Sequence, residues 1–373
     1  MKILHICSDY FNTEVYDHLF SNLENLGVEN TIFVPSEEHE SKIISYHNRR
    51  IIRVYQGDPK PFSLQLNKRR LVFELKKYVK NIQNFSVIHA HYLLKDGILA
   101  RELNKKLNLP IIISVRSTCI SEFSRYYAVH NLITSFRNIY SSKKLIFQSV
   151  KSRQEFIHKT KRLVSKNLMN NSAVISNGIN SFWFKQDSAI KTRKSLNRKE
   201  IKFISAASIE ENKNLLLLAD TIEKINGLKP YQGSLTICGK ILDHKIYEQL
   251  LEYSCVKYIG EISHTELKKE FENCDIFILL SHRETFGLVY AEALTQGLPV
   301  IYSRNQGFDG QFAEGFIGYS CESTDQKELI FKIDEIIFNF NHLFSNTQSA
   351  SQKFQWKYVA KNILKVYEAE LNR

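Results

Sequence analysis

The stretch from Cys274 to Tyr302, CDIFILLSHRETFGLVYAEALTQGLPVIY, determines the fold that we expect for this chain. It opens with a short apolar run, Ile276 to Leu280, bounded by polar residues, which indicates a buried strand. After a polar turn, helix formers with apolar spacing continue until Gly297 and Pro299, which end a helix. A second apolar run begins at Val300. The stretch therefore predicts a strand–loop–helix–strand unit, whose loop lies where open α/β sheets bind ligands.

Two carboxylates mark this unit. Glu284 lies in the loop, and Glu292 follows eight residues later in the expected helix. An entirely helical span of that length would cover roughly 12 Å, at about 1.5 Å per residue. The sugar and the ribose of a nucleotide-diphosphate sugar are separated by a comparable distance. One carboxylate could therefore accept hydrogen bonds from sugar hydroxyls and the other from ribose hydroxyls.

The start of the expected helix suits the diphosphate between these two rings. Unpaired N–H groups and the positive end of the helix dipole favour an anion there, and Gly287 lets it approach the backbone closely. Taken alone, the glutamate pair has a plainer explanation. Glu292 would be a solvated helix position, and Glu284 an acid favoured by the dipole at the helix start.

The complete string is more specific than the pair. It reads S-x-x-E-x-F-G-L-x-x-x-E-A-x-x-x-G-x-P-V, from Ser281 to Val300, and resembles the donor-site signature of glycosyltransferase family 4, the large retaining group with the GT-B fold. The resemblance implies an α/β protein with two Rossmann-like, doubly wound parallel-sheet domains that face a central cleft. It makes Glu284 a catalytic residue. It also implies donor-binding residues at Thr285, Phe286, Gly287, Leu288, Glu292 and, in a separate loop, Gly239.

The rest of the chain alternates apolar runs with helix-like stretches, as in parallel doubly wound sheets. A strand ends in an Asn-Gly turn at Val174–Ile179, VISNGI, and a polar stretch follows. This segment resembles the interdomain segment of family 4, with Ser176 where proline is common. We therefore expect an N-terminal acceptor-binding domain over 1–178 and a donor-binding domain over 179–355. The terminal helix, 356–373, is expected to pack back on the first domain.

Lys213 is the second catalytic candidate. It opens an expected helix, where a cation opposes the dipole unless an anion shares the site, and it can act as a point charge on phosphate. The alternative is a solvated lysine. Family 4 usually has Arg-x-x-x-x-Lys in this loop, and here Ser208 stands at the arginine position. One charge that would stabilise the leaving group is therefore missing.

The first half offers two weaker candidates. His89-Ala90-His91 ends a strand and resembles the H-x-H of family 4, so His91 could reach the cleft or could be a hydrogen-bonded core histidine. Arg116 follows the expected strand Ile111–Val115 and could bind the donor phosphate or an acceptor anion, or form a surface ion pair.

Charge is distributed unevenly along the chain. Residues 1–180 contain 27 Lys and Arg against 14 Asp and Glu, whereas the remainder contains 24 against 25. A basic half attracts lipid headgroups, nucleic acid or a phosphorylated acceptor, unless it is an ordinary solvated face. Interleaved stacking aromatics in a recognised motif are missing, which disfavours nucleic acid. We expect peripheral contact with an anionic membrane.

The remaining patterns limit location and cofactors. No apolar run reaches the roughly 18 residues of a membrane span, and the N-terminus enters directly into a strand pattern. Six cysteines without C-x-x-C spacing indicate buried thiols in a reducing cytoplasm. Neither Asp-x-Asp nor H-E-x-x-H occurs, so we expect no metal, and without G-x-G-x-x-G no dinucleotide cofactor. The expected location is cytoplasmic, at or near the inner face of the membrane.

These patterns lead to one hypothesis and two alternatives. The chain is expected to move a sugar from a nucleotide-diphosphate donor to a hydroxyl of a glycan or lipid-linked acceptor, with retention, in the synthesis of bacterial surface polysaccharide or another glycoconjugate. A nucleotide-sugar 2-epimerase would share the architecture but need no acceptor. A non-catalytic protein, suggested by Ser208, would bind the nucleotide sugar and never release nucleotide diphosphate.

Overall fold

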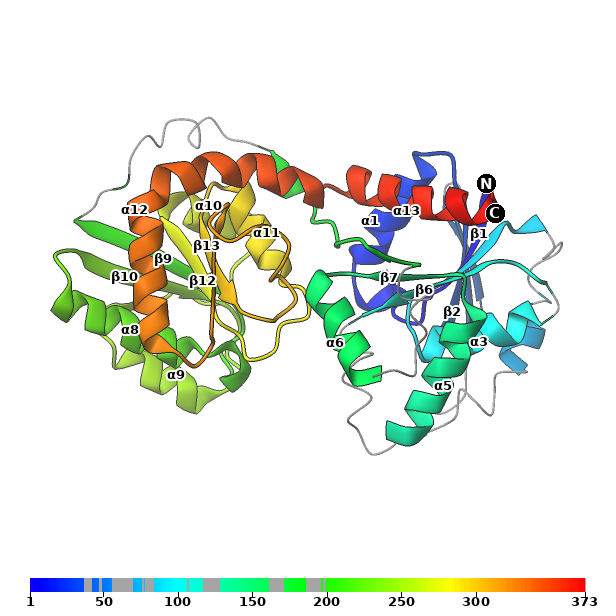
Figure 1. Cartoon of the computed structure of the whole chain (residues 1–373), viewed down its shortest axis with the longest axis horizontal. Helices are drawn as coiled ribbons and strands as arrows, with labels where there is room; N and C mark the ends of the chain where they lie inside the picture. The colour runs from blue at the N-terminus through cyan, green and yellow to red at the C-terminus, as the bar shows by residue number, and fades with distance from the viewer. Residues whose placement is uncertain are drawn as a thin grey trace. The chain divides into compact units, whose positions relative to one another are not determined.

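The structure is a computed structural model that describes residues 1–36, 42–46, 49–55, 70–75, 77, 84–105, 107–116, 128–160, 171–185, 196 and 199–372 (Figure 1). The chain forms two compact units. Unit 1 contains Met1–Gly178 and Trp356–Arg373, and unit 2 contains Ile179–Gln355. The polypeptide therefore passes from the first unit to the second and back again.

Unit 1 is built on an eight-stranded sheet of order β3-β4-β2-β1-β5-β6-β7-β8. The strands are β1 (Lys2–Ile6), β2 (Glu29–Ser36), β3 (Lys42–Tyr46), β4 (Arg49–Tyr55), β5 (Val87–Ala90), β6 (Ile111–Val115), β7 (Lys144–Phe147) and β8 (Ser172–Val174). Neighbouring strands are parallel except β3, which pairs antiparallel with β4 at the edge of the sheet. The sheet is therefore parallel as expected, with one antiparallel strand added at its edge.

Both faces of this sheet are covered, as alternating side chains of β1 show. Leu4 and Ile6 pack into one apolar cluster, and Ile3 packs into another on the opposite face. A strand that is apolar on both sides belongs in the middle of a sheet covered by helices on both faces. Among the described residues, the helices of unit 1 include α1 (Val15–Glu24), α3 (Lys95–Asn104), α5 (Ala128–Ser141), α6 (Val150–Thr160) and α13 (Trp356–Leu371), with the 3₁₀ turn η1 (Tyr10–Asn12).

Helix α13 completes the core of unit 1 although it ends the sequence. Its side chains Val359, Ile363 and Tyr367 are buried in the same apolar cluster as residues of α1. Figure 1 shows the two helices side by side. A Cβ on Gly178 would lie 2.4 Å from the ring of Trp356, so glycine permits the close approach at the start of α13.

Unit 2 contains a six-stranded parallel sheet of order β11-β10-β9-β12-β13-β14. Its strands are β9 (Glu200–Ala206), β10 (Gln232–Cys238), β11 (Val256–Tyr258), β12 (Ile276–Leu279), β13 (Val300–Ser303) and β14 (Gly318–Cys321). In chain order this is the arrangement 3-2-1-4-5-6 of a dinucleotide-binding Rossmann sheet. The order reverses between β9 and β12, and ligands of such sheets bind at that switch point, beyond the carboxyl ends of the strands.

Helices and 3₁₀ turns of unit 2 cover both faces of its sheet. They are η5 (Ser181–Phe184), η7 (Glu211–Lys213), α8 (Leu215–Leu228), α9 (His244–Leu251), α10 (His264–Asn273), α11 (Leu288–Thr295), α12 (Gln326–Ser351) and η8 (Gln352–Phe354). The strand-loop-helix-strand unit expected from Cys274 to Tyr302 is present as β12, α11 and β13. Its loop opens at the switch point.

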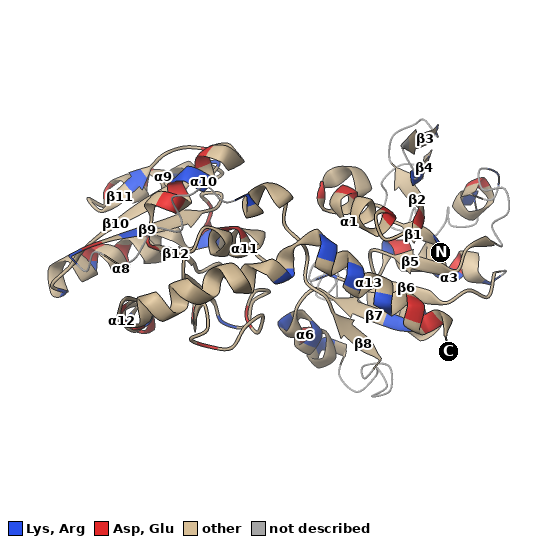
Figure 2. Ribbon diagram, turned by 90° about the horizontal axis from the view of Figure 1, so that it is seen from above, with Lys and Arg blue, Asp and Glu red and all other residues tan. Residues whose placement is uncertain are grey.

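The described residues modify the expectation of a basic surface. Arg49 and Arg53 contribute to the basic excess of residues 1–180, yet both are buried in unit 1. Lys68, Lys161 and their basic neighbours at 69, 76, 80 and 162 lie outside the described residues. Figure 2 shows Lys and Arg on α6 and α13. None of the described helices is both long and apolar enough to cross a membrane. Five of the six cysteines are buried free thiols, as expected, and Cys119 is not among the described residues.

Candidate functional site

Two loops of unit 2 meet through an ion pair at the switch point. The loop after β9 presents Lys213 at the end of η7, and the loop after β12 presents Glu284. The Lys213 Nζ lies 3.0 Å from Glu284 Oε2, and the side chains are 18% and 13% exposed. The structure therefore brings together the two residues predicted to be catalytic, although they are 71 positions apart.

Asn212 joins the same two loops through hydrogen bonds to the backbone of the loop that carries Glu284. Its Nδ2 donates to the carbonyl of Arg283 at 3.0 Å, and its Oδ1 accepts from the Arg283 N–H at 3.0 Å. Its own carbonyl accepts from the N–H of His282 at 2.8 Å. Sequence reasoning missed this residue. An asparagine before a lysine gives no local signal, because its partners belong to a distant loop.

Glu284 is fixed by several hydrogen bonds besides the ion pair. Its N–H donates to Gln306 Oε1 at 3.0 Å, and its carbonyl accepts from the Gly307 N–H at 2.9 Å. The side chain accepts from the Thr285 N–H at 3.1 Å and from Ser281 Oγ at 3.3 Å. Gln306 and Gly307 were not predicted as site residues, although the Gly307–Gly310 turn is visible in the sequence. The carboxylate is thus held in one orientation before any ligand binds.

Gly287 forms the N-cap of α11 in a left-handed conformation with φ of 76°. A Cβ at this position would lie 2.4 Å from the ring of Tyr290. Gly287 supplies no side-chain cap, and the first N–H groups of a helix have no intrahelical partner. Leu288, the first helical residue, is half-buried. The start of α11 therefore presents backbone donors beside Glu284, as the sequence predicts for a diphosphate site.

The side chains around this turn differ in what they can contact. Phe286 is buried, with its ring centroid 6.4 Å from that of Phe308 and 6.0 Å from that of Phe354. Its side chain is a core group, so only its backbone could meet a ligand. Thr285, in contrast, is exposed. The donor-binding role predicted for this stretch therefore rests mainly on backbone groups and on Thr285.

Glu292 lies on α11 and is half-buried. Burial raises the pKa of its carboxyl from 4.5 to about 7, while the indole of Trp183 acts on that pKa in the opposite direction. The Trp183 N–H is buried and makes no hydrogen bond within the described part of the chain. The indole therefore stabilises the carboxylate only weakly, and the Glu292 carboxyl loses its proton near neutral pH.

Replacing Glu292 by Gln is expected to stabilise the protein at pH 8 but not at pH 4.5. The wild-type carboxyl stays protonated in the folded chain between pH 4.5 and 7, where it ionises in the unfolded chain. Wild-type stability therefore falls as pH rises through this window, by up to about 3 kcal/mol, and Gln removes that loss. Urea denaturation at both pH values measures the difference. Glu248→Gln, an exposed glutamate on α9, is the control, and an equal effect of Glu292→Gln at both pH values would contradict the assignment.

Gly239 and Ser208 lie on the adjoining ends of β10 and β9. A Cβ on Gly239, whose φ is 144°, would lie 2.0 Å from the carbonyl oxygen of Ala207. The Gly239 N–H donates to the carbonyl of Gly260 at 2.8 Å, so this amide is already used. Ser208 Oγ donates to a carboxylate oxygen of Glu210 at 2.7 Å. The position of the missing arginine therefore faces an acid rather than presenting a cation.

In unit 1, the two weaker candidates lie together at the carboxyl ends of β5 and β6. His91 is buried, and Arg116 is half-buried with its Nε 3.4 Å from the His91 carbonyl oxygen. The Arg116 guanidinium lies 4.9 Å from the ring centroid of Tyr16. Asp96, which the sequence did not single out, is buried and accepts from the Ser8 N–H at 3.2 Å. Burial raises the pKa of Asp96 to about 8.

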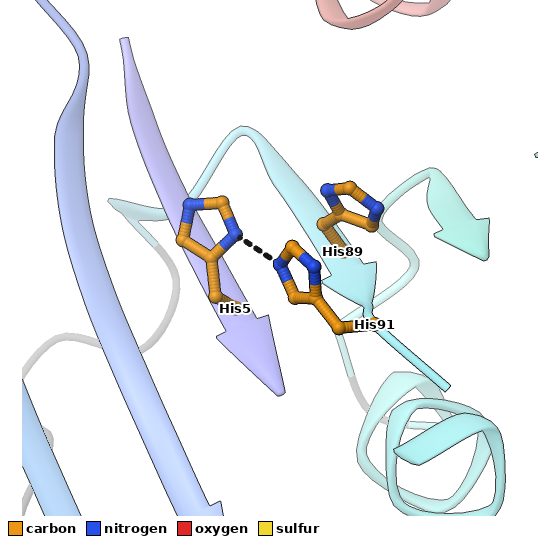
Figure 3. A group of neighbouring side chains, drawn as sticks. All are labelled: His5, His89 and His91. Carbon is orange, nitrogen blue, oxygen red and sulfur yellow. Dashed lines mark hydrogen bonds between the residues drawn. The ribbon is translucent and has the colours of Figure 1, made fainter. Parts of the chain in front are cut away.

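His5, His89 and His91 are close enough to approach a common metal ion, with ligand atoms within 4.8 Å of one another (Figure 3). Most of their ring nitrogens already have partners. His5 contacts Asn30 and His91, and His89 contacts Tyr367 and Ser114, at 2.7 to 3.0 Å. A metal would have to replace these hydrogen bonds. Independence from metal remains a prediction from the sequence.

Two family models match the chain in succession. The model described as Glycosyltransferase Family 4 matches residues 14–181, and the model described as Glycosyl transferases group 1 matches residues 186–344. The first match lies in unit 1, apart from its last three residues, and the second lies within unit 2.

Curated relatives and solved structures agree with these matches. An uncharacterized glycosyltransferase of Methanocaldococcus jannaschii is 23% identical over 361 residues, covering 94% of this chain and 92% of the relative. The alpha-monoglucosyldiacylglycerol synthase of Acholeplasma laidlawii is 27% identical over 279 residues, covering 69% of each chain. A sucrose-phosphate synthase structure from Thermosynechococcus elongatus superposes with a TM-score of 0.75 at 18% identity, covering 99% of this chain and 98% of that one. Anabaena HepE in complex with UDP gives 0.73 at 18% identity, covering 99% and 100%.

Proposed function

The chain belongs to glycosyltransferase family 4 and is a glycosyltransferase with the GT-B fold, and from this we propose that it transfers a sugar from a nucleotide-diphosphate donor to an acceptor hydroxyl with retention. One observation carries the proposal. The Lys213–Glu284 pair lies at the switch point of the unit 2 sheet, beside the uncapped start of α11. A cation, backbone donors and a fixed carboxylate at that place suit a phosphorylated sugar. The UDP complex of HepE supports a nucleotide donor by analogy.

Each group has a distinct role in this proposal. Lys213 and the first N–H groups of α11 stabilise the diphosphate as it leaves, an electrostatic effect that usually dominates catalysis. Glu284 orients the sugar and Glu292 the ribose, which holds the reacting carbon in place. In the retaining mechanism implied by the family resemblance, the leaving phosphate accepts the proton of the acceptor hydroxyl. No separate general base is then required.

Lys213 can serve both Glu284 and the diphosphate. An ammonium group has three donors, and the hydrogen bond to Glu284 uses one of them. The ion pair therefore positions the ammonium group and leaves its two other N–H donors for the diphosphate. Because Ser208 replaces the arginine of the family, Lys213 is the only Lys or Arg between 208 and 214, and this loop contributes one cation.

A thermal-shift screen against nucleotide sugars and free nucleoside diphosphates tests the proposal, because a ligand of the native state raises its stability by mass action. The selected donor is then incubated with and without glycan or lipid acceptors. Acceptor-dependent release of nucleoside diphosphate, with an α-linked product from an α-donor, supports retaining transfer. Conversion of the donor alone into a stereoisomer would indicate an epimerase. Binding without release under any acceptor would indicate the non-catalytic alternative, which the Ser208–Glu210 contact favours.

Lys213→Ala is expected to weaken binding of the selected nucleoside diphosphate by about tenfold to a hundredfold. The reason is loss of a charge-assisted hydrogen bond worth about 1.5 to 3 kcal/mol. Calorimetric titration measures the affinity. Lys257→Ala, an exposed lysine on β11, serves as the matched control. An affinity of the Lys213 variant equal to that of the control would remove this side chain from the phosphate site.

We propose a glycan or lipid-linked acceptor at the inner face of the membrane, in the synthesis of surface polysaccharide or another glycoconjugate. The name of the Acholeplasma relative, alpha-monoglucosyldiacylglycerol synthase, supports a lipid-linked acceptor. Helix α6 supports membrane contact, since it exposes the apolar Ile157 and carries Lys151, Arg153 and Lys159, the last of which pairs with Glu155 at 2.8 Å. Basic helices with exposed apolar side chains bind anionic interfaces.

Vesicle binding tests this part of the proposal. The protein is expected to cosediment with vesicles of anionic phospholipid at low salt and to be released at 0.5 M salt, because salt screens exposed charges. Vesicles of zwitterionic lipid are the control. Equal recovery with both kinds of vesicle, or none at low salt, would contradict electrostatic membrane contact.

A further inference from the structure

A chain of buried hydrogen bonds in unit 1 leads from an ion pair to His91. It begins where the Arg49 Nε lies 2.9 Å from Glu24 Oε1, with the Arg49 side chain 2% and the Glu24 side chain 11% exposed. A carboxylate paired with a guanidinium is ionised and can only accept hydrogen bonds. The orientation of the next group follows from this.

Asn30 is buried, and its amide can point in only one direction. Its Nδ2 lies 3.2 Å from Glu24 Oε1 and 3.2 Å from the carbonyl oxygen of Phe20. Both of these neighbours are acceptors, so the amide nitrogen must face them, and a flipped amide would place oxygen against oxygen. The Asn30 Oδ1 therefore faces His5 Nε2, at 2.9 Å.

This orientation determines where the proton of His5 lies. The Asn30 oxygen can only accept, so His5 Nε2 must carry a hydrogen. Burial lowers the pKa of His5 to about 3, so the ring is neutral and its Nδ1 bears a lone pair. That Nδ1 lies 3.0 Å from His91 Nε2, drawn as the dashed line in Figure 3. His91 Nε2 must therefore donate to it.

One nitrogen then remains at the end of the chain. Burial lowers the pKa of His91 well below its ordinary value, so this ring is neutral too, and its Nδ1 carries a lone pair. The His91 side chain is buried, and its Nδ1 has no hydrogen-bond partner within the described residues. A buried acceptor without a donor destabilises the folded chain, and a ligand that donates a hydrogen bond to it offsets this cost.

We propose that Asn30, acting through His5, holds His91 in the Nε2–H tautomer, so that His91 Nδ1 accepts a hydrogen bond from a hydroxyl and cannot donate one to a phosphate. The inference deepens the proposed function and rests on it for the source of the hydroxyl, a glycan or lipid-linked acceptor bound by unit 1. Asn30 and His5 are positioning residues. Arg116, beside His91, is then the group suited to an anion.

The position of the proton can be observed directly by NMR of the ¹⁵N-labelled full-length protein. The expected result is a one-bond coupling between the shared proton and His91 Nε2, with both His5 Nδ1 and His91 Nδ1 unprotonated. A proton bound to His5 Nδ1, or to His91 Nδ1, would overturn the proposal. This measurement needs no substrate, so its outcome is independent of whether sugar transfer is demonstrated.

Two variants test whether Asn30 and His5 impose this state. Asn30→Leu removes the acceptor, and His5→Phe removes the relay while keeping a ring against Phe20. Each is expected to give a second population of His91 with the proton on Nδ1, and Asn22→Leu, which loses an α1 contact to His18, is expected to give none. If Asn30→Leu does not fold, His5→Phe alone tests whether the relay imposes the His91 tautomer. An unchanged single tautomer in the folded variants would overturn the positioning role.

The ligand class is tested with an acceptor that supports release of nucleoside diphosphate in the transfer assay. Adding this acceptor is expected to shift the His91 Nδ1 resonance, whereas inorganic phosphate is expected to leave it unchanged. A shift with phosphate alone would overturn the hydroxyl assignment. If the acceptor binds and the resonance does not move, the hydroxyl assignment is wrong.

Discussion

Glu284→Gln is expected to lower sugar transfer by at least about a hundredfold, while the affinity for free nucleoside diphosphate falls less than threefold. Glu284 is held by Ser281, Thr285 and Lys213, so its carboxylate is aimed before the sugar arrives. Gln keeps the shape but offers one acceptor oxygen where the carboxylate has two. Steady-state kinetics and calorimetric titration with nucleoside diphosphate separate the two effects.

The matched control is Glu211→Gln, an exposed glutamate in η7 of the facing loop, which should transfer sugar at the wild-type rate. The sequence alone suggests that removing Glu284 leaves the melting temperature unchanged. The partly buried pair with Lys213 instead predicts a loss of about 1 to 3 kcal/mol in the free energy of unfolding. Wild-type turnover in a folded Glu284→Gln variant would exclude this carboxylate from the site.

Gly307→Ala is expected to abolish transfer and to lower the free energy of unfolding by about 2 to 4 kcal/mol. A Cβ at this position would lie 2.0 Å from the Thr285 carbonyl oxygen and 2.7 Å from the Phe286 Cα. Both obstacles are backbone, so no side-chain rotation relieves the clash. The loop that carries Glu284 must therefore move. Urea denaturation and a transfer assay at the same protein concentration measure both effects.

Gly227→Ala provides the comparison for this loop, because Gly227 lies in α8 and a Cβ there meets nothing within 4 Å. Alanine at a helical position without a clash is expected to stabilise by about 0.5 to 1 kcal/mol. If Gly307→Ala behaved like Gly227→Ala, the close approach of the two loops would have no functional consequence.

Much of the fold follows from apolar runs and their spacing. The strand Ile111–Val115 has the expected bounds, and the terminal helix begins at the expected Trp356 and ends at Leu371, two residues before the expected end. Helix α5 was not predicted, because AVHNLITSFRNIYS is rich in β-branched and aromatic residues that favour strands in isolation. The strand β14 was also missed, since GYSC contains a glycine, a serine and too few residues to show alternation.

The candidate site shows a different limit of sequence reasoning. The residues between Ser281 and Val300 form a contiguous string, so their pattern could be matched as a whole. The geometry of Glu284 also depends on contacts from Asn212, Gln306 and Gly307. These contacts are determined by which strand ends lie side by side. That information comes from the order of the strands in the sheet. Likewise, Arg49 counts as surface charge in the sequence but is neutralised in the core by Asp17 and Glu24.

The return of α13 to unit 1 has a consequence for how the protein is made. Unit 2 is continuous in sequence, from Ile179 to Gln355, whereas unit 1 needs residues from both ends of the chain. Domains generally fold in the order in which the ribosome produces them, the N-terminal one first. Here the N-terminal half must wait, with the groove for α13 open, until residues 356–371 have been translated. Premature termination near residue 355 would leave a finished second unit attached to an unfinished first one.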